Sequence, residues 1–267
     1  MSEVSLIMLY IQFSTVIGCL LVGSILDLIK REVSDIPWIL MAAVGIITTI
    51  VFLIYTENKR GDGILIGVNF VIGVVMGFLL FYTGVMGGAD AKAIMALSVN
   101  TAVYPFPFEL TQLDVYQYIP GIFNIFFNWL LVMIVIYPLP LLFFNLYKRA
   151  KGEKLFEETN ANFASKILMM ISGYLAPVSK TKDRLDIVYS EVYDKEEEQW
   201  EIKHFIQVAE IEEEEKYKKE VEENIEKTKR EKIWVKVLPP GIIFLLIGYI
   251  INIFIGNIFF MIYSFAF

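Results

Sequence analysis

Long uncharged runs separated by short polar stretches fill most of the chain, and this pattern predicts membrane-spanning helices. Apolar segments lie at about residues 5–28, 36–55, 64–85, 91–104, 122–146 and 238–264. An α-helix rises about 1.5 Å per residue, so roughly 20 apolar residues cross the hydrocarbon core of a bilayer, which is about 30 Å thick. The fourth segment is short for a crossing, and we interpret it as tilted, partly buried or dipping.

A strongly charged region separates the fifth apolar segment from the sixth. Residues 147–237 hold 18 of the 23 Lys and Arg residues and 21 of the 30 Asp and Glu residues, which requires water around them. Short apolar alternation predicts strands near Leu185–Tyr193 and Gln199–Val208. The Glu/Lys-rich stretch Glu210–Lys232 predicts a solvated helix. Phe163–Leu175 is amphipathic and is predicted to lie along the membrane surface.

These patterns predict an α-helical polytopic membrane protein with about six transmembrane helices. A small mixed α/β cytoplasmic region is inserted before the last helix. The expected parts are a transmembrane catalytic bundle of five helices at residues 1–146, a cytoplasmic soluble region at 147–237 and a C-terminal transmembrane helix at 238–267. Composition agrees, since 56% of the 267 residues are hydrophobic and the mean hydropathy is +0.58. Soluble domains average about 45–50% apolar residues.

Short-loop cations predict the orientation, because Lys and Arg are enriched on the cytoplasmic side of membrane proteins. They follow the first and fifth segments, open the fourth and precede the sixth, which six crossings place on one side. The loop at residues 105–121 has none, whereas Lys59 and Arg60 fall on the opposite side. The expected location is the cytoplasmic membrane, with the N-terminus outside.

Scarce histidine and cysteine exclude several kinds of chemistry. Cys19 is the only cysteine and His204 the only histidine, so neither a disulfide nor a Cys/His metal cluster can form within the chain. A Ser-His-Asp triad would need His204, and no nucleophile-elbow sequence supports one. No Walker-type sequence follows the glycines near residue 88. We therefore expect no metal, no cofactor and no nucleic-acid partner.

Nine acidic residues lie outside the charged region, and two of them need an explanation. Asp27 stands among apolar residues near the end of the first segment, and Asp90 stands at the mouth of the fourth. Ionisable residues at a membrane boundary usually face a bundle interior or a water-filled cavity, although each alone could simply cap a helix end or snorkel. Asp35 follows Ser34 and precedes Ile36-Pro37, which fits a helix N-cap better than a direct role in an active site.

The relation between the two aspartates favours a catalytic pair. Asp27 ends the first span and Asp90 follows the third, so both lie on the same side of the membrane. Two carboxylates that approach each other can share one proton, and such a pair hydrolyses peptides without a metal or a covalent intermediate. Gly87 and Gly88 fit this hypothesis, because glycine permits backbone angles closed to other residues and lets a substrate strand come close. Ordinary small-residue packing is the alternative explanation for them.

Two motifs resemble the Gly-x-Gly-Asp membrane aspartyl proteases, specifically the archaeal preflagellin and type IV prepilin peptidases. They are Leu26-Asp-Leu-Ile-Lys-Arg-Glu-Val-Ser-Asp-Ile-Pro-Trp38 and Gly87-Gly-Ala-Asp-Ala-Lys92, and the closing Ile233-Trp-Val-Lys with Pro239-Pro240 also looks like the archaeal branch. The resemblance implies that Asp27 and Asp90 are catalytic. It gives supporting positions to Gly87, Gly88, Ala89, Lys92 and Asp35. Ala89 departs from the motif, which has glycine there; a small side chain is the expected requirement at this position.

The resemblance also implies a substrate. Such enzymes cut the short basic leader from preflagellins or type IV pilin-like precursors at the cytoplasmic face, so those precursors and the lipid bilayer are the expected partners. Two alternatives keep the aspartates without the hydrolysis. One is a non-catalytic scaffold or inactive homologue in a secretion or pilus assembly system. The other is a transporter that uses the aspartates as proton carriers, although no repeat halves or paired broken helices support it.

Overall fold

The computed structural model describes residues 2–84, 86–101, 120–181, 184, 186–203, 211–258 and 261–262. The chain divides into two compact units. The first comprises residues 1–132 and 240–267, and the second comprises residues 133–239. Residues 102–119, which include most of the predicted cation-free loop, and His204 lie outside the described residues.

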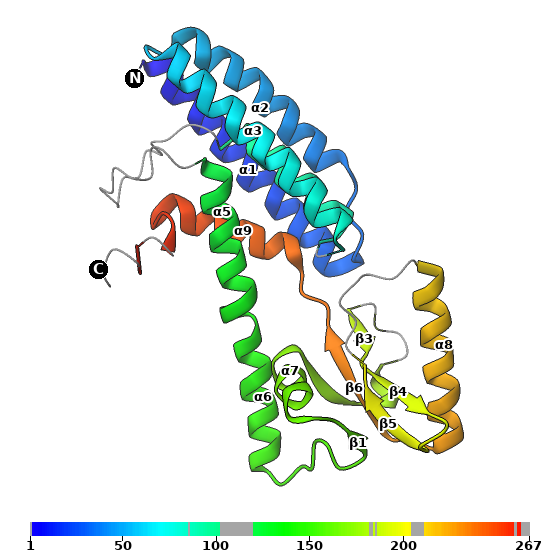
Figure 1. The fold of residues 1–267 in the computed structure, drawn as a ribbon. Helices are drawn as coiled ribbons and strands as arrows, with labels where there is room; N and C mark the ends of the chain where they lie inside the picture. Colours follow the sequence, from blue (N-terminus) through cyan, green and yellow to red (C-terminus); the bar gives the residue numbers. More distant parts are fainter. Residues whose placement is uncertain are drawn as a thin grey trace. The chain divides into compact units, whose positions relative to one another are not determined.

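The first unit is helical (Figure 1). Its helices are α1 (Glu3–Lys30), α2 (Ile36–Tyr55), α3 (Lys59–Tyr82), α4 (Gly88–Val99), α5 (Gly121–Leu131) and α9 (Gly241–Phe254). Within the described part of the chain, α1, α2, α3 and the continuous helix Gly121–Ala150 are long and apolar enough to cross a membrane. The protein is therefore a polytopic membrane protein. The predicted segments at 91–104 and 238–264 do form helices, but α4 has 12 residues and α9 has 14.

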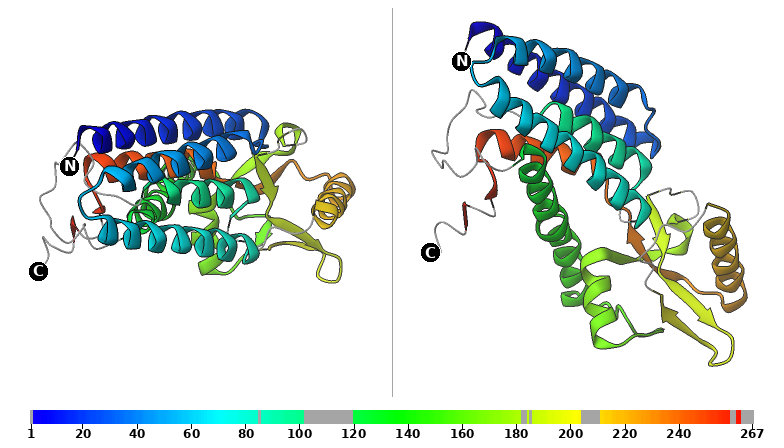
Figure 2. Two further views of the ribbon diagram at one scale, coloured as in Figure 1. Left: turned by 90° about the horizontal axis from the view of Figure 1, so that it is seen from above. Right: turned by 45° about the horizontal axis from the view of Figure 1, so that its top comes forward.

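Packing in this unit joins helices that are far apart in sequence. Helix α1 contacts α2 and α9, α4 packs between α2 and α3, and α5 packs on α9; Figure 2 shows the long helices α1 to α3 side by side. The core is formed by large apolar side chains that are almost completely buried: Leu20, Met41, Ile94, Leu97, Ile122, Ile125, Leu245 and Tyr249. On the outer side, Ile39, Ile47 and Ile50 of α2 are each more than half exposed, as expected for a helix that faces lipid.

Buried amide side chains tie the helices together. The Asn69 amide nitrogen donates to the Ser98 carbonyl (2.5 Å), and its oxygen accepts from the Ile122 backbone N–H (2.9 Å). Asn100 donates in the same way to the Met41 carbonyl at 3.0 Å. Backbone groups at a helix end need such partners because lipid offers no water to bond with them. The Asn69 side chain thus supplies partners to one backbone group at the end of α4 and one at the start of α5.

The second unit is mixed α/β, as the sequence predicted. In chain order it contains α6 (Pro138–Ala150), β1 (Thr159–Asn160), α7 (Phe163–Ser172), β2 (Gly173–Pro177), the 3₁₀ turn Val178–Lys180, β3 (Ile187–Tyr189), β4 (Glu191–Asp194), β5 (Gln199–Ile202), α8 (Ile211–Thr228) and β6 (Lys232–Val237). The strands form two three-stranded sheets, ordered β1-β5-β4 and β2-β6-β3. In the first sheet β1 runs parallel to β5, and the remaining pairs in both sheets are antiparallel.

Both predicted strand regions and the Glu/Lys-rich helix are present, and one predicted helix is too long. The first strand region divides into β3 and β4, and the second contains β5, beyond which residues 204–210 are not described. Helix α7 ends at Ser172 because Gly173 enters β2 opposite Lys236 of β6. A Cβ at Gly173 would lie 2.1 Å from the Val235 carbonyl oxygen, so only glycine permits this pairing.

Candidate active site

Asp27 lies in the last turn of α1, and the way that helix ends determines its position. Arg31 follows the helix in the left-handed conformation (φ 56°), and its N–H donates to the Asp27 carbonyl at 3.1 Å. One turn earlier, a Cβ on Gly23 would lie 2.5 Å from Trp38 of α2 and 3.3 Å from Ile242 of α9. The bare Gly23 backbone therefore lets α1 approach both neighbours next to Asp27.

Asp90 is the third residue of α4. Gly87 precedes the helix in extended conformation (φ −68°, ψ 161°). The chain enters this turn through Gly84, which has a φ of 69° and donates to the Phe81 carbonyl at 3.0 Å. Glycine in the left-handed conformation just beyond a helix is a common helix-ending signal. Gly84 was missed in the sequence, although its place directly after an apolar run was the signal that could have found it.

The structure brings the two predicted carboxylates together. Asp27 and Asp90 are both partly buried, and they lie close enough for their charges to interact. The start of α9 lies beside both, since Gly241 abuts the Asp90 carboxylate and Ile242 packs on Gly23, one turn before Asp27. The site is therefore formed by the end of α1, the start of α4 and the start of α9, all within the first unit.

The start of α9 was not predicted to belong to the site. Helix α9 begins at Gly241, after Pro240. A Cβ placed on Gly241 would lie 2.5, 2.6 and 2.7 Å from Oδ2, Oδ1 and Cγ of Asp90, so the carboxylate rests against the bare Cα. Pro239-Pro240-Gly241 marks a helix start in the sequence, but nothing there indicates which distant residue it meets.

The residues around Asp90 have simpler roles than expected. Neither Gly87 nor Gly88 has a positive φ, and a Cβ on either would meet only ordinary contacts at 3.7 and 3.5 Å. Neither glycine therefore uses the backbone freedom that its residue type permits. Ala89 lies inside α4 and also has no positive φ, so the replacement of the motif glycine causes no backbone strain. A small side chain is sufficient there.

Asp35 precedes α2 at the N-cap position, but its side chain makes no capping hydrogen bond. The predicted carboxylate cap is therefore wrong. Its carboxylate instead accepts a hydrogen bond from Lys92 Nζ at 2.7 Å, with both side chains about half exposed. This pair links two of the five predicted supporting positions and connects the start of α2 with the first turns of α4.

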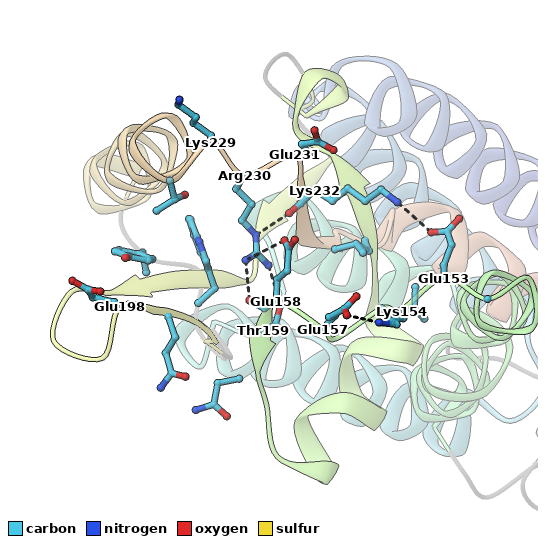
Figure 3. A pocket seen from close by; sticks show the side chains of 18 residues that line it. Glu153, Lys154, Glu157, Glu158, Thr159, Glu198, Lys229, Arg230, Glu231 and Lys232 are labelled. Carbon is cyan, nitrogen blue, oxygen red and sulfur yellow. Dashed lines mark hydrogen bonds and ion pairs between the residues drawn. The ribbon is translucent and has the colours of Figure 1, made fainter.

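The second unit contains an open hollow of about 1210 Å³ (Figure 3). Its charged lining is mixed, with Glu153, Glu157, Glu158, Glu198 and Glu231 beside Lys154, Lys229, Arg230 and Lys232. The labelled side chains come from the loop before β1 and from β1 itself, from the β4–β5 turn, and from the segment after α8 up to the first residue of β6. Arg230 and Lys232 form hydrogen bonds and ion pairs with acidic and backbone groups of the protein itself. We therefore interpret these two cations as stabilising the unit and not as binding a ligand.

Behind the hollow, Arg230 is paired with a fully buried Glu191. Nη2 of Arg230 donates to both carboxylate oxygens, at 2.8 and 3.0 Å, and the Trp234 backbone N–H donates at 2.9 Å. The Thr159 hydroxyl is a further donor. Burial raises the pKa of Glu191, while the Arg230 guanidinium and these hydrogen bonds oppose that effect. The pair ties β1, β4 and β6 together, so we assign it to the stability of the unit.

Two neighbouring carboxylates, one at a helix end and one at a helix start, form a group that can share one proton. Residues 14–139 match the Type IV leader peptidase family, and residues 165–258 match the family described as Archaeal Peptidase A24 C-terminus Type II. The chain is therefore similar to these peptidase families along most of its length. Asp27 and Asp90 fall in the first match, and Gly241 falls in the second.

Three relatives are preflagellin peptidases of methanogens. The Methanococcus voltae protein is 32% identical over 166 residues, which are 61% of this chain and 66%, just under two thirds, of that protein. The protein of Methanococcus maripaludis strain C6 is 26% identical over 244 residues, 89% of this chain and 92% of the relative. The Methanocaldococcus jannaschii protein is 34% identical over 104 residues, which are 38% of this chain and 44% of that protein. No solved structure matches the chain significantly.

Proposed function

We propose that this protein is a membrane aspartyl endopeptidase that removes the short basic leader peptide from preflagellins or type IV pilin-like precursors. Asp27 and Asp90 are its catalytic residues. The observation that carries the proposal is the approach of these two carboxylates from α1 and α4, within the segment that matches the leader peptidase family. The names of the relatives favour preflagellins as the substrates.

The proposed reaction needs only the two aspartates and water. Burial and mutual repulsion favour a pair that holds a single proton. The ionised carboxylate accepts a proton from water as the water oxygen attacks the scissile carbonyl carbon, and the protonated carboxyl donates its proton to the carbonyl oxygen. Collapse of the tetrahedral intermediate breaks the C–N bond; the leaving amine takes a proton from the pair, and one hydroxyl of the intermediate returns a proton to it, so the pair again holds one proton. The two aspartates titrate as one unit, so neither has a fixed role as acid or base.

The membrane arrangement is part of the same proposal. Six apolar segments enter or cross the cytoplasmic membrane, with the N-terminus outside and residues 147–237 in the cytoplasm. Residues 1–146 form the catalytic bundle, and residues 238–267 contain the last membrane helix. The compact units meet within the helix Gly121–Ala150, at residues 132 and 133. The proposed boundary between membrane and cytoplasm falls later in the same helix, after residue 146. A cytoplasmic site lets the precursor keep its apolar helix in lipid while its basic leader reaches the aspartates.

Isosteric substitutions test the pair. Asp27→Asn and Asp90→Asn each remove one ionisable group, and each should lower cleavage by about 100-fold or more while the protein stays folded, since general acid–base catalysis contributes about 10²- to 10⁴-fold. The assay is leader removal from the preflagellin of M. voltae by the full-length chain in membranes, read as a size shift. Asp62→Asn is the control, because Asp62 lies in the first turn of α3 and accepts a hydrogen bond from Thr56. Full activity in either variant would refute the catalytic pair, and no cleavage by the wild type would favour a non-catalytic scaffold.

A further inference from the structure

The first turn of α9 lies against Asp90 and beside the end of α1, and its amino-acid sequence makes this possible. Gly241 and Ile242 are the first two residues of the helix. The Asp90 carboxylate rests on the Gly241 Cα, and the Ile242 side chain packs on Gly23, one turn before Asp27 in α1. Amide groups in the first turn of a helix have no partner within the helix and carry the positive end of its dipole. A pair of carboxylates is a suitable neighbour for that end.

We propose that Gly241 is a positioning residue for the peptidase reaction. Its lack of a side chain seats the Asp90 carboxylate against the α9 N-terminus and thereby sets its distance from Asp27. This inference rests on the proposed function, because it concerns how the same two aspartates are held. In this proposal Gly241 does not contact the substrate. It acts only by positioning the Asp90 carboxylate.

The distances show how little space there is. A Cβ at Gly241 would meet three atoms of the Asp90 carboxyl group within 2.7 Å. Ordinary carbon contacts begin near 3.4–3.5 Å, so an added methyl group requires a movement of roughly 1 Å by Asp90 or by the start of α9. A misplacement of about that size can cost on the order of 100-fold in rate.

The start of α9 is itself held in place, so the movement falls on the carboxylate. Trp129 of α5 donates from Nε1 to the Gly241 carbonyl at 3.3 Å, and its indole is almost completely buried. On the opposite side, the Ile242 side chain packs on the Gly23 backbone of α1. Two helices therefore fix the turn that Asp90 contacts.

Few charged groups among the residues that the structure describes could shift the titration of Asp90. Asp27 of α1 is the one that interacts with it. Lys92, on the same helix as Asp90, pairs with Asp35. Helix α9 has no charged residue in Gly241–Phe254. A change in the acidic limb of the pH–rate profile upon substitution of Gly241 would therefore report on the carboxylate pair.

The decisive variant is Gly241→Ala, compared with Gly45→Ala of α2 as a matched control. A Cβ at Gly45 would meet the end of the Asn100 side chain at 2.5–2.8 Å, much as one at Gly241 would meet Asp90, but Asn100 is an amide that follows the far end of α4. Cleavage of M. voltae preflagellin is measured in membranes with the full-length chain, per folded enzyme. We expect Gly241→Ala to lower kcat about 100-fold with KM changed less than about threefold. The acidic limb should move upward by about half a pH unit as Asp90 loses the helix N-terminus.

Gly45→Ala should lower thermal stability while the folded fraction keeps its kcat and its pH profile. If Gly241→Ala fails to fold, Trp129→Phe is the second test, since it removes the hydrogen bond to the Gly241 carbonyl and keeps an aromatic ring. It should lower kcat about two- to tenfold and move the acidic limb of the pH–rate profile in the same direction. A kcat within twofold of wild type in the folded Gly241→Ala variant, or equal kcat and pH changes in Gly45→Ala, would overturn the positioning role. That result leaves the catalytic pair intact if Asp27→Asn and Asp90→Asn remain inactive.

Discussion

The buried Arg230–Glu191 pair allows a stability prediction to be worked out from the structure. Arg230→Met removes the guanidinium and leaves a fully buried carboxylate with the Thr159 hydroxyl and the Trp234 N–H as its remaining donors. It also removes the hydrogen bonds to the Glu158 and Lys232 carbonyls at 2.9 and 2.8 Å. Breaking a buried pair in this way costs about 3–5 kcal/mol. Domains are stable by about 5–15 kcal/mol, so the second unit should lose a large fraction of its free energy of unfolding.

Urea-dependent pulse proteolysis of the full-length chain in detergent measures the unfolding midpoint of the second unit. Lys232→Met is the matched control. Nζ of Lys232 lies 3.5 Å from a carboxylate oxygen of Glu153, and both side chains are partly exposed, so this ion pair contributes at most about 1 kcal/mol to stability. The double variant Arg230→Met/Glu191→Gln should recover part of the loss because no unpaired charge is left buried. A loss below about 1 kcal/mol for Arg230→Met, or a double variant no more stable than the single, would refute the reasoning.

Three further predictions concern the membrane unit and its surface. Ala89→Gly restores the motif glycine but should change cleavage by less than about threefold and cost about 0.5–1 kcal/mol of stability, read from a thermal melt, because the position is helical; a tenfold gain in rate would show that backbone freedom matters there. Lys92→Met, which breaks the exposed pair with Asp35, should cost less than about 1 kcal/mol in the same melt, and a larger loss would mean that the pair is shielded by lipid. A spin label at Ile167 of α7, whose side chain is 47% exposed, should be accessible to oxygen dissolved in lipid; accessibility to a water-soluble relaxation agent alone would contradict a surface-lying helix.

Much of the helical framework could be predicted from apolar runs alone. The second segment was predicted at residues 36–55 and is α2 with those bounds, because charged or polar residues stand at both ends of an uninterrupted apolar run. The sequence also predicts that Asp27 and Asp90 lie on one side of the membrane, since two crossings separate them. Their approach to each other on that side was a hypothesis that the order in sequence allowed but did not require.

Contacts with distant partners were not predictable. Gly173 ends a helical pattern because β6 passes beside it, more than fifty residues later in the chain. Gly241 meets Asp90 across about 150 residues, and neither position carries a local mark of the other. The Asp35 carboxylate was expected to cap its own helix, but the longer-range Lys92 ammonium binds it instead. In each case a tertiary contact outweighed the local preference that the sequence displays.

The amide of Asn69 has a consequence for how this protein tolerates change. It binds the Ser98 carbonyl near the end of α4 and the Ile122 N–H at the start of α5, and a Cβ on Gly121 would lie 1.9 Å from the Thr101 carbonyl oxygen. The last turn of α4 and the first turn of α5 are therefore joined at one point, about 12 Å along α4 from Asp90. Lengthening a segment whose two ends already touch costs little entropy. An epitope tag or fluorescent reporter inserted between residues 102 and 119 should leave proteolysis unimpaired, which offers a place to label the working enzyme.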